Sequence, residues 1–279
     1  MRFFSFAIVG LLCLCSCSES LSLLSEKQTT LLAGLSGDHT FIQAFPFDKY
    51  RICVVPKQGS FYLDTTDDSI KKVLASGEPW EYETDQVIYQ YTKSGTVALD
   101  IGAHIGTHTV ALSRAVGADG VVIAFEPNPK IYRELCMNLI LNGCTNVIPV
   151  QCALGDHDGQ VGLLTPVAYN EGGTYVVTDG GGLVALRKLD DFGLQNISFI
   201  KMDVENYEEM VLAGGEETIM ASRPVIFLEI QGNGEQLIAS GANCEQKTEA
   251  TISALKNMNY TTSVFKGLDY LAKPMECGS

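Results

Sequence analysis

The fold of this chain is decided by the stretch Val97-Ala98-Leu99-Asp100-Ile101-Gly102-Ala103-His104-Ile105-Gly106-Thr107-His108-Thr109. An apolar run ends in an acid and turns through two glycines just before a helical pattern begins. This order is typical of a parallel strand whose carboxyl end opens into a ligand crevice. We therefore expect a nucleotide-type site at the turn.

His104 narrows the kind of ligand that the turn can accept. It occupies the position at which a dinucleotide fingerprint has its second glycine, where the backbone approaches a pyrophosphate. A bulky side chain at this point argues against a diphosphate, and hence against a nicotinamide-dependent oxidoreductase. The glycines that remain, Gly102 and Gly106, still let the backbone lie close to a nucleoside.

A second acid stands 20 residues beyond Gly106. The run Val121–Phe125 predicts another apolar strand, and Glu126 follows it, before Pro127 and Asn128. A ribose diol is usually held by an acid at this distance, because a carboxylate can accept hydrogen bonds from both hydroxyls. We predict that Glu126 binds ribose; the alternative is an acid in a surface turn.

The rest of the chain alternates apolar strands with amphipathic helices. Ile105, Leu112 and Val116 lie at helical spacing after the turn, and Gly117 is expected to end that helix. This alternation predicts a parallel sheet with right-handed crossovers. Further strands are expected at 147–150, 197–202 and 225–228, helices ending at Asn142-Gly143 and Gly214-Gly215, a last helix at 250–258, and hairpin strands at 260–265 and 268–272.

Shorter elements are expected around this sheet. A hairpin is predicted within 50–63 and helices at 69–74 and 85–91, while 157–187 is glycine-rich with short β pieces, a composition common in loops that shape substrate access. Trp80, the single tryptophan, either forms a lid over the site or packs in a core, as aromatic residues usually do.

Three ordered motifs carry a family resemblance. They are Asp100-Ile101-Gly102-Ala103-x-Ile105-Gly106, Ala124-Phe125-Glu126-Pro127-Asn128-Pro129 and Ile200-Lys201-Met202-Asp203-Val204-Glu205. Over about residues 60 to 230 the chain resembles FkbM-type S-adenosylmethionine-dependent methyltransferases, although His104 stands where that family commonly has Asn, and Asn206-Tyr207 where it commonly has Gly-Ala. The resemblance implies an α/β fold: a Rossmann-like, seven-stranded class I methyltransferase sheet with helices on both faces, a terminal antiparallel hairpin and an N-terminal extension.

The same resemblance implies S-adenosylmethionine as the cofactor. Ala153 and Leu154 follow the third strand, and in the family this segment borders the adenine base. Asp156, beside them, either bonds the exocyclic amine or caps a turn. The cofactor-binding residues expected from the turn, the acid and the resemblance are Asp100, Gly102, Ala103, His104, Gly106, Thr107, Glu126, Pro127, Asn128, Ala153, Leu154 and Asp203.

The catalytic residues are expected at the ends of the fourth and fifth strands. Methyl transfer is an in-line displacement, so the enzyme must hold nucleophile, methyl group and sulfur collinear, and a hydroxyl nucleophile must also lose its proton. Asp203 should face the methyl group and is the first choice of base, with Glu205 and Glu229 second. Lys201 could hold a substrate carboxylate or keep an acid ionised. The alternative is that Lys201 and Glu205 form structural ion pairs.

Two further chemistries can be weighed from the residues. Carboxylates near one crevice could hold a divalent cation, but there is no compact ligand motif, and we predict no metal site. His104 and His108 could act as bases near pH 7, or they could orient the turn and pack.

Composition limits the partners. The 279 residues carry 33 acidic and 19 basic side chains, a net charge of -14, with no Lys/Arg cluster longer than a pair. Binding a polyanion is unfavourable at this charge, so nucleic acid is not an expected partner. The expected partner is a small-molecule or glycan acceptor, and no oligomeric state is predicted.

The first residues have a different character from the rest. Arg2, an apolar run and the small residues Ser16-Cys17-Ser18 match a secretory signal peptide, with a lipoprotein leader as the alternative. We expect a leader at 1–18, an N-terminal extension or cap at 19–90 and the methyltransferase domain at 91–279. The expected location is the secretory pathway, secreted or at the cell envelope, with the membrane reached only through an N-terminal anchor.

The leading hypothesis is an O-methyltransferase that acts on a hydroxyl of a glycan, lipid-linked sugar or small metabolite. The alternative is a non-catalytic binding protein that retains the methyltransferase fold.

Overall fold

The computed structural model describes residues 23–25, 28, 45–65, 68–165, 171–177, 183–230 and 244–276. The expected leader at 1–18, and most of the segment up to residue 44, lie outside these residues. Among the described helices, none is both long and apolar enough to cross a bilayer.

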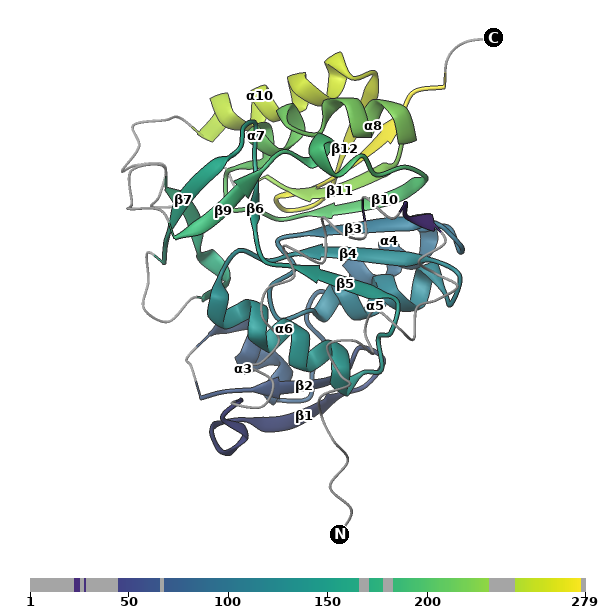
Figure 1. The fold of residues 1–279 in the computed structure, drawn as a ribbon. Coiled ribbons are helices and arrows are strands. Elements are labelled where there is room, and N and C mark those ends of the chain that lie inside the picture. Colours follow the sequence, from purple (N-terminus) through teal and green to yellow (C-terminus); the bar gives the residue numbers. More distant parts are fainter. Residues whose placement is uncertain are drawn as a thin grey trace.

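A seven-stranded sheet forms the centre of the molecule (Figure 1). Its strand order is β12-β13-β11-β10-β3-β4-β5, and all pairings among the last five are parallel, whereas β13 is antiparallel to both β11 and β12. This confirms the predicted fold class, terminal hairpin included. The strands are β3 (Val97–Ile101), β4 (Val121–Phe125), β5 (Val147–Val150), β10 (Ile197–Met202), β11 (Val225–Glu229), β12 (Tyr260–Lys266) and β13 (Asp269–Pro274).

Helices cover both faces of the sheet (Figure 1). On one face Leu99 and Ile101 of β3 belong to the same buried cluster as residues of α7, α8 and α10. On the other face Ala98 belongs to the cluster that contains residues of α4, α5 and α6. Alternate strand side chains point to opposite faces, so β3 serves both layers. The helices are α4 (Tyr82–Tyr91), α5 (Thr107–Val116), α6 (Pro129–Leu141), α7 (Glu208–Ala213), α8 (Glu216–Ser222) and α10 (Cys244–Asn257).

The segment before the sheet packs against α6. The expected hairpin forms as β1 (Arg51–Val55) and β2 (Gly59–Leu63), followed by α3 (Ser69–Ala75). Two asparagines, one in α6 and one at its C-cap, complete the edge of β2: Asn138 Oδ1 accepts from the Tyr62 amide at 2.7 Å and Asn142 Oδ1 from the Ser60 amide at 2.9 Å. Backbone groups that would otherwise lack partners are thus bonded, which fixes the extension on the domain.

The glycine-rich region forms a second, smaller sheet with the order β6-β9-β7-β8. Its strands are β6 (Ala153–Leu154), β7 (Gly159–Leu164), β8 (Tyr175–Val177) and β9 (Val184–Arg187). The sequence predicted short β pieces around Val161–Leu164 and Tyr175–Val177, which correspond to β7 and β8, but it predicted neither β6 nor β9.

Three boundaries differ from expectation. The helix expected to close at Gly214-Gly215 does end there, but a second helix, α8, follows at once. The last helix begins at Cys244 rather than 250, and the hairpin turn is Gly267-Leu268 rather than Lys266-Gly267.

Candidate active site

The turn after β3 is held by a close backbone approach. Gly102 has φ +82, and a Cβ built on it would lie 1.8 Å from the carbonyl oxygen of Asp203, so only glycine fits. The Asp203 amide donates to the Ile101 carbonyl at 2.9 Å, which brings the ends of β3 and β10 together. Gly106, at φ +92, begins α5. The two glycines thus have the roles expected for a ligand-binding turn.

A cavity opens beside this turn. Eight of the predicted site residues line it: Gly102, His104, Glu126, Pro127, Ala153, Leu154, Asp203 and Glu205. Its volume is about 80 Å³, whereas small-molecule sites usually measure about 300–1,000 Å³. Admission of a nucleoside therefore requires wall residues to move.

Glu126 is buried in the wall of the cavity and is anchored at both oxygens. Oε1 accepts from the Asn128 amide at 2.8 Å, and Oε2 accepts from the His104 amide at 2.9 Å. Burial raises the pKa of Glu126 to about 7, and the two amide donors oppose that shift. Each oxygen has a further lone pair, so the carboxylate can still accept from a ligand hydroxyl.

His104 also lines the cavity, and it adopts a left-handed backbone conformation with φ +49. Both ring nitrogens are buried and have no hydrogen-bond partner within the part of the chain that the structure describes. Burial lowers the pKa of His104 to about 4, so the ring is neutral at pH 7. A base near pH 7 is therefore not the role that this environment favours.

Asp100 does not share the hollow with Glu126, contrary to expectation. It is fully buried, and its Oδ2 accepts from the Thr109 hydroxyl at 2.6 Å, so the side chain is directed at α5. The cause is the alternation of β3, which places Asp100 on the face of Ala98 while Ile101 reaches the cavity. A direct role for Asp100 in binding the cofactor stays a prediction that this geometry does not favour.

Four more predicted cofactor residues stand outside the cavity wall: Ala103, Gly106, Thr107 and Asn128. Asn128 caps α6 by accepting from the Lys130 amide at 3.0 Å. Asp156 is also outside the wall, with Oδ1 2.7 Å from Nδ1 of the exposed His157. This position favours the turn role for Asp156 over contact with a base.

Lys201 lies beneath the turn, on the same face of the sheet as Asp100. Its ammonium donates to the Gly102 carbonyl at 3.3 Å and to Asp203 Oδ2 at 3.4 Å. The surrounding carboxylates raise the pKa of this buried lysine, so it remains a cation. Lys201 therefore ties the glycine turn to Asp203, and its expected role toward a substrate carboxylate or a neighbouring acid stays a prediction.

Glu229 lies across the strand ends from these residues, opposite Asp269 in the pairing of β11 with β13. Burial and the charges of Asp203 and Glu81 raise the pKa of Glu229 to about 8. The same influences raise the pKa of Asp269 to about 6. Both residues line a neighbouring cavity of about 260 Å³, together with Glu81. Glu229 is therefore close to the predicted site but does not line the first cavity.

Sequence reasoning missed the acids that come from other segments. Glu81 precedes α4 with φ +42, and its carboxylate lies 3.4 Å from His108 Nε2. Nδ1 of His108 lies 2.9 Å from Asp85, and these carboxylates raise its pKa to about 9. His108 therefore pairs with two acids instead of remaining available as a neutral base.

Trp80 is partly buried and packs against the core shared by α4 and α5, outside the wall of the first cavity.

One wall of the first cavity, which we call the roof, is formed by two segments whose contact the sequence analysis did not predict. Ile70 of α3 and the Glu171–Gly172 segment line it. Asp68 joins them, because its Oδ2 accepts from the amides of Glu171 at 3.0 Å and Gly172 at 3.3 Å, while Oδ1 caps α3.

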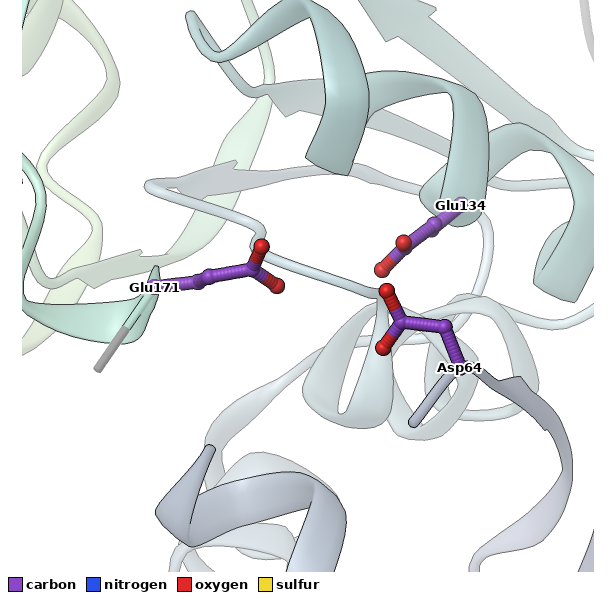
Figure 2. A group of neighbouring side chains, drawn as sticks. All are labelled: Asp64, Glu134 and Glu171. Carbon is purple, nitrogen blue, oxygen red and sulfur yellow. The ribbon is translucent and has the colours of Figure 1, made fainter. Parts of the chain in front are cut away.

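Behind the roof, three carboxylates converge, as Figure 2 shows for Asp64, Glu134 and Glu171. Their oxygens are close enough for a metal ion. Two lysines, however, already bridge them: Lys71 Nζ lies 2.7–2.8 Å from all three acids, and Lys130 Nζ lies 2.7 Å from Asp64. We assign this group to structure, because ammonium groups occupy the space between the carboxylates.

Comparisons with known proteins found several methyltransferases with limited similarity to this chain. A 64-residue stretch is 38% identical to a fibrillarin-like rRNA/tRNA 2′-O-methyltransferase of Pyrobaculum aerophilum, which is 23% of this chain and about a quarter (26%) of that protein. The crystal structure of a methyltransferase FkbM from Methylobacillus flagellatus is 14% identical, with a TM-score of 0.45 over 88% of this chain and 58% of that one. A SAM-dependent O-methyltransferase from Thermotoga maritima is 12% identical, with a TM-score of 0.47 over 82% and 79%.

The family itself is established by a different comparison. The model of the methyltransferase FkbM domain matches residues 100–261, more than half of the chain, from the end of β3 into β12. This range contains all three motifs on which the resemblance was based. The chain therefore belongs to the FkbM family of S-adenosylmethionine-dependent methyltransferases.

Proposed function

We propose that this protein binds S-adenosylmethionine in the cavity beside Gly102 and methylates a hydroxyl of a glycan, lipid-linked sugar or small metabolite. The observation that carries the proposal is Glu126, a buried acid in the cavity wall with acceptor capacity remaining on both oxygens. The residues fit a nucleoside without phosphates, because a diphosphate would meet the negative charges of Glu126 and Asp203.

Each part of the cavity has a counterpart in that cofactor. Glu126 would accept from the ribose hydroxyls, and Ala153 and Leu154 supply an apolar wall for the base. Asp203 and Glu205 would stand at the amino-acid end. When bound, the cofactor supplies a methyl group already activated by a sulfonium, so the protein's work is to position the acceptor and take its proton.

Two acids are candidates for the proton acceptor. Asp203 lines the proposed cofactor cavity, and the Lys201 ammonium lies 3.4 Å from its Oδ2. Glu229, with a pKa of about 8, is mainly protonated at pH 7 and becomes a base only at higher pH. We therefore propose Asp203 as the base that takes the proton of the acceptor at pH 7, with Glu229 as a second base only above about pH 8.

Partners and location belong to the same proposal. The net charge of -14 supports a small-molecule or glycan acceptor over a nucleic acid. The residues at 1–18 support passage through the secretory route.

The test begins with calorimetric titration of the purified protein with S-adenosylmethionine, S-adenosylhomocysteine and NAD. Binding of the first two but not of NAD is expected. Methyl transfer from labelled S-adenosylmethionine to a panel of sugars, polyols and phenols then follows. Affinity for NAD alone would refute the proposal. Binding without turnover on any acceptor, in the wild type and in Asp203→Asn alike, would favour the non-catalytic alternative.

A further inference from the structure

The imidazole of His104 is the least explained polar group in the cavity. Both nitrogens are buried and, among the described residues, have no hydrogen-bond partner. A buried polar group without a partner destabilises a folded protein, and such groups are uncommon. The left-handed backbone at φ +49 adds strain that glycine would avoid. An arrangement that is unfavourable in the free protein indicates a contact formed with a ligand.

The chemistry of the ring limits which ligand group it can meet. The imidazole is neutral at pH 7, because burial lowers the pKa of His104 to about 4. It therefore offers one N–H donor and one acceptor nitrogen. A hydroxyl group, which both donates and accepts, is the complement of such a ring.

The position of the ring selects a hydroxyl of the ribose. The backbone amide of His104 donates to Glu126 Oε2 at 2.9 Å, so the histidine is attached to the very carboxylate that would bind the diol. That carboxylate, once ionised, can only accept hydrogen bonds. The hydroxyl oxygens also need a donor, and the His104 ring lines the same cavity.

We propose that the His104 ring donates a hydrogen bond to a ribose hydroxyl of the cofactor and thereby complements Glu126. This inference rests on the proposed function. It makes His104 a specificity-determining residue that distinguishes ribose from deoxyribose. It also explains why a histidine occupies a position where glycine is sterically easier.

The experiment measures binding, so no acceptor needs to be known. S-adenosylhomocysteine, adenosine, 2′-deoxyadenosine and 3′-deoxyadenosine are titrated into the full chain and into the variants His104→Gly and His104→Asn. Asparagine tolerates the left-handed conformation but is too short to reach as far as the imidazole. His157→Asn, at an exposed histidine, is the matched control.

Loss of one neutral hydrogen bond should weaken S-adenosylhomocysteine binding by about fivefold to tenfold in both variants. The preference of the wild type for adenosine over one of the two deoxynucleosides should shrink by the same factor. The melting temperature of the free protein should stay level or rise, because each variant removes two unpartnered nitrogens.

Two outcomes would overturn the inference while leaving the proposed function intact. One is a wild-type protein that binds S-adenosylhomocysteine but whose variants retain its full preference for adenosine. The other is a loss of affinity that occurs only together with a fall in the melting temperature of the free variants, as expected if the His104 ring has only a packing role. If the wild type binds none of the ligands, the proposed function itself fails.

Discussion

Two groups of buried or partly buried acids in this molecule differ in the cations that lie beside them. Around Asp64, Glu134 and Glu171, two lysine ammonium groups lie between three carboxylates. At the ends of β10, β11 and β13, Asp203, Glu229 and Asp269 gather near Lys201, and burial and mutual repulsion raise the pKa of Glu229 to about 8 and of Asp269 to about 6. In the first group, ammonium groups occupy the space between the carboxylates. In the second, the pKa values of Glu229 and Asp269 lie near neutral pH, a property that is common among residues of functional sites.

The largest effect is expected from Lys71→Met in the first group. The methionine fills similar volume but leaves the buried Glu134 and its two neighbours with Lys130 as their remaining ammonium partner, and breaking a buried ion pair usually costs about 3–5 kcal/mol of unfolding free energy. Urea denaturation measures this loss. Lys256→Met, at an exposed position on α10, is the control and should change the free energy by less than about 0.5 kcal/mol. Equal losses of unfolding free energy in the two variants would contradict a stabilising role of Lys71 among the three acids.

For the proposed base of the second group, the main effect should be on activity. Removing the proposed base with Asp203→Asn is expected to lower kcat by about 100-fold or more, with affinity for S-adenosylhomocysteine changed little. Glu229→Gln should alter the pH profile of kcat in the region of pH 8, where Glu229 titrates. The comparison between the groups fails if Asp203→Asn destabilises the fold as much as Lys71→Met does.

Stability against pH gives a third test. Glu229 has a pKa above its unfolded value, so the folded state holds the proton more tightly. The stability that Glu229 contributes is fully present below about pH 4.5 and is lost as pH rises through about 8. Asp269→Asn removes a neighbouring negative charge and should lower the pKa of Glu229. The decline of unfolding free energy between pH 5 and 8 should therefore become shallower, as denaturation at several pH values would measure. An unchanged slope would mean that the two carboxyl groups do not interact.

The contrast also shows what sequence patterns can and cannot locate. The strand ends were predictable, because apolar runs bounded by glycines mark β3 and β4 and place Glu126 in the crevice. The sheet face on which Asp100 lies could have been predicted from the alternation of strand side chains. Ala98, two residues earlier, points to the same face of the sheet. The cluster of Lys71 with its three acids could not be predicted, because Lys71 and Glu171 lie 100 residues apart in the sequence. Glu81 and Asp269 likewise come from segments whose approach depends on packing.

The smallest effect concerns the roof that Asp68 fastens over the cofactor cavity. Asp68→Asn keeps an oxygen to cap α3, but loses the charge with which the side chain holds the amides of Glu171 and Gly172. Since the cavity of about 80 Å³ must widen to admit a nucleoside, a looser roof should speed both association and dissociation of S-adenosylhomocysteine, by about twofold to tenfold. Stopped-flow fluorescence can follow this through Trp80, the single tryptophan of the chain. Rates equal to those of the wild type would mean that a different part of the cavity wall moves when the ligand enters. Asp68 would then have a purely structural role, like that of Lys71 and Lys130.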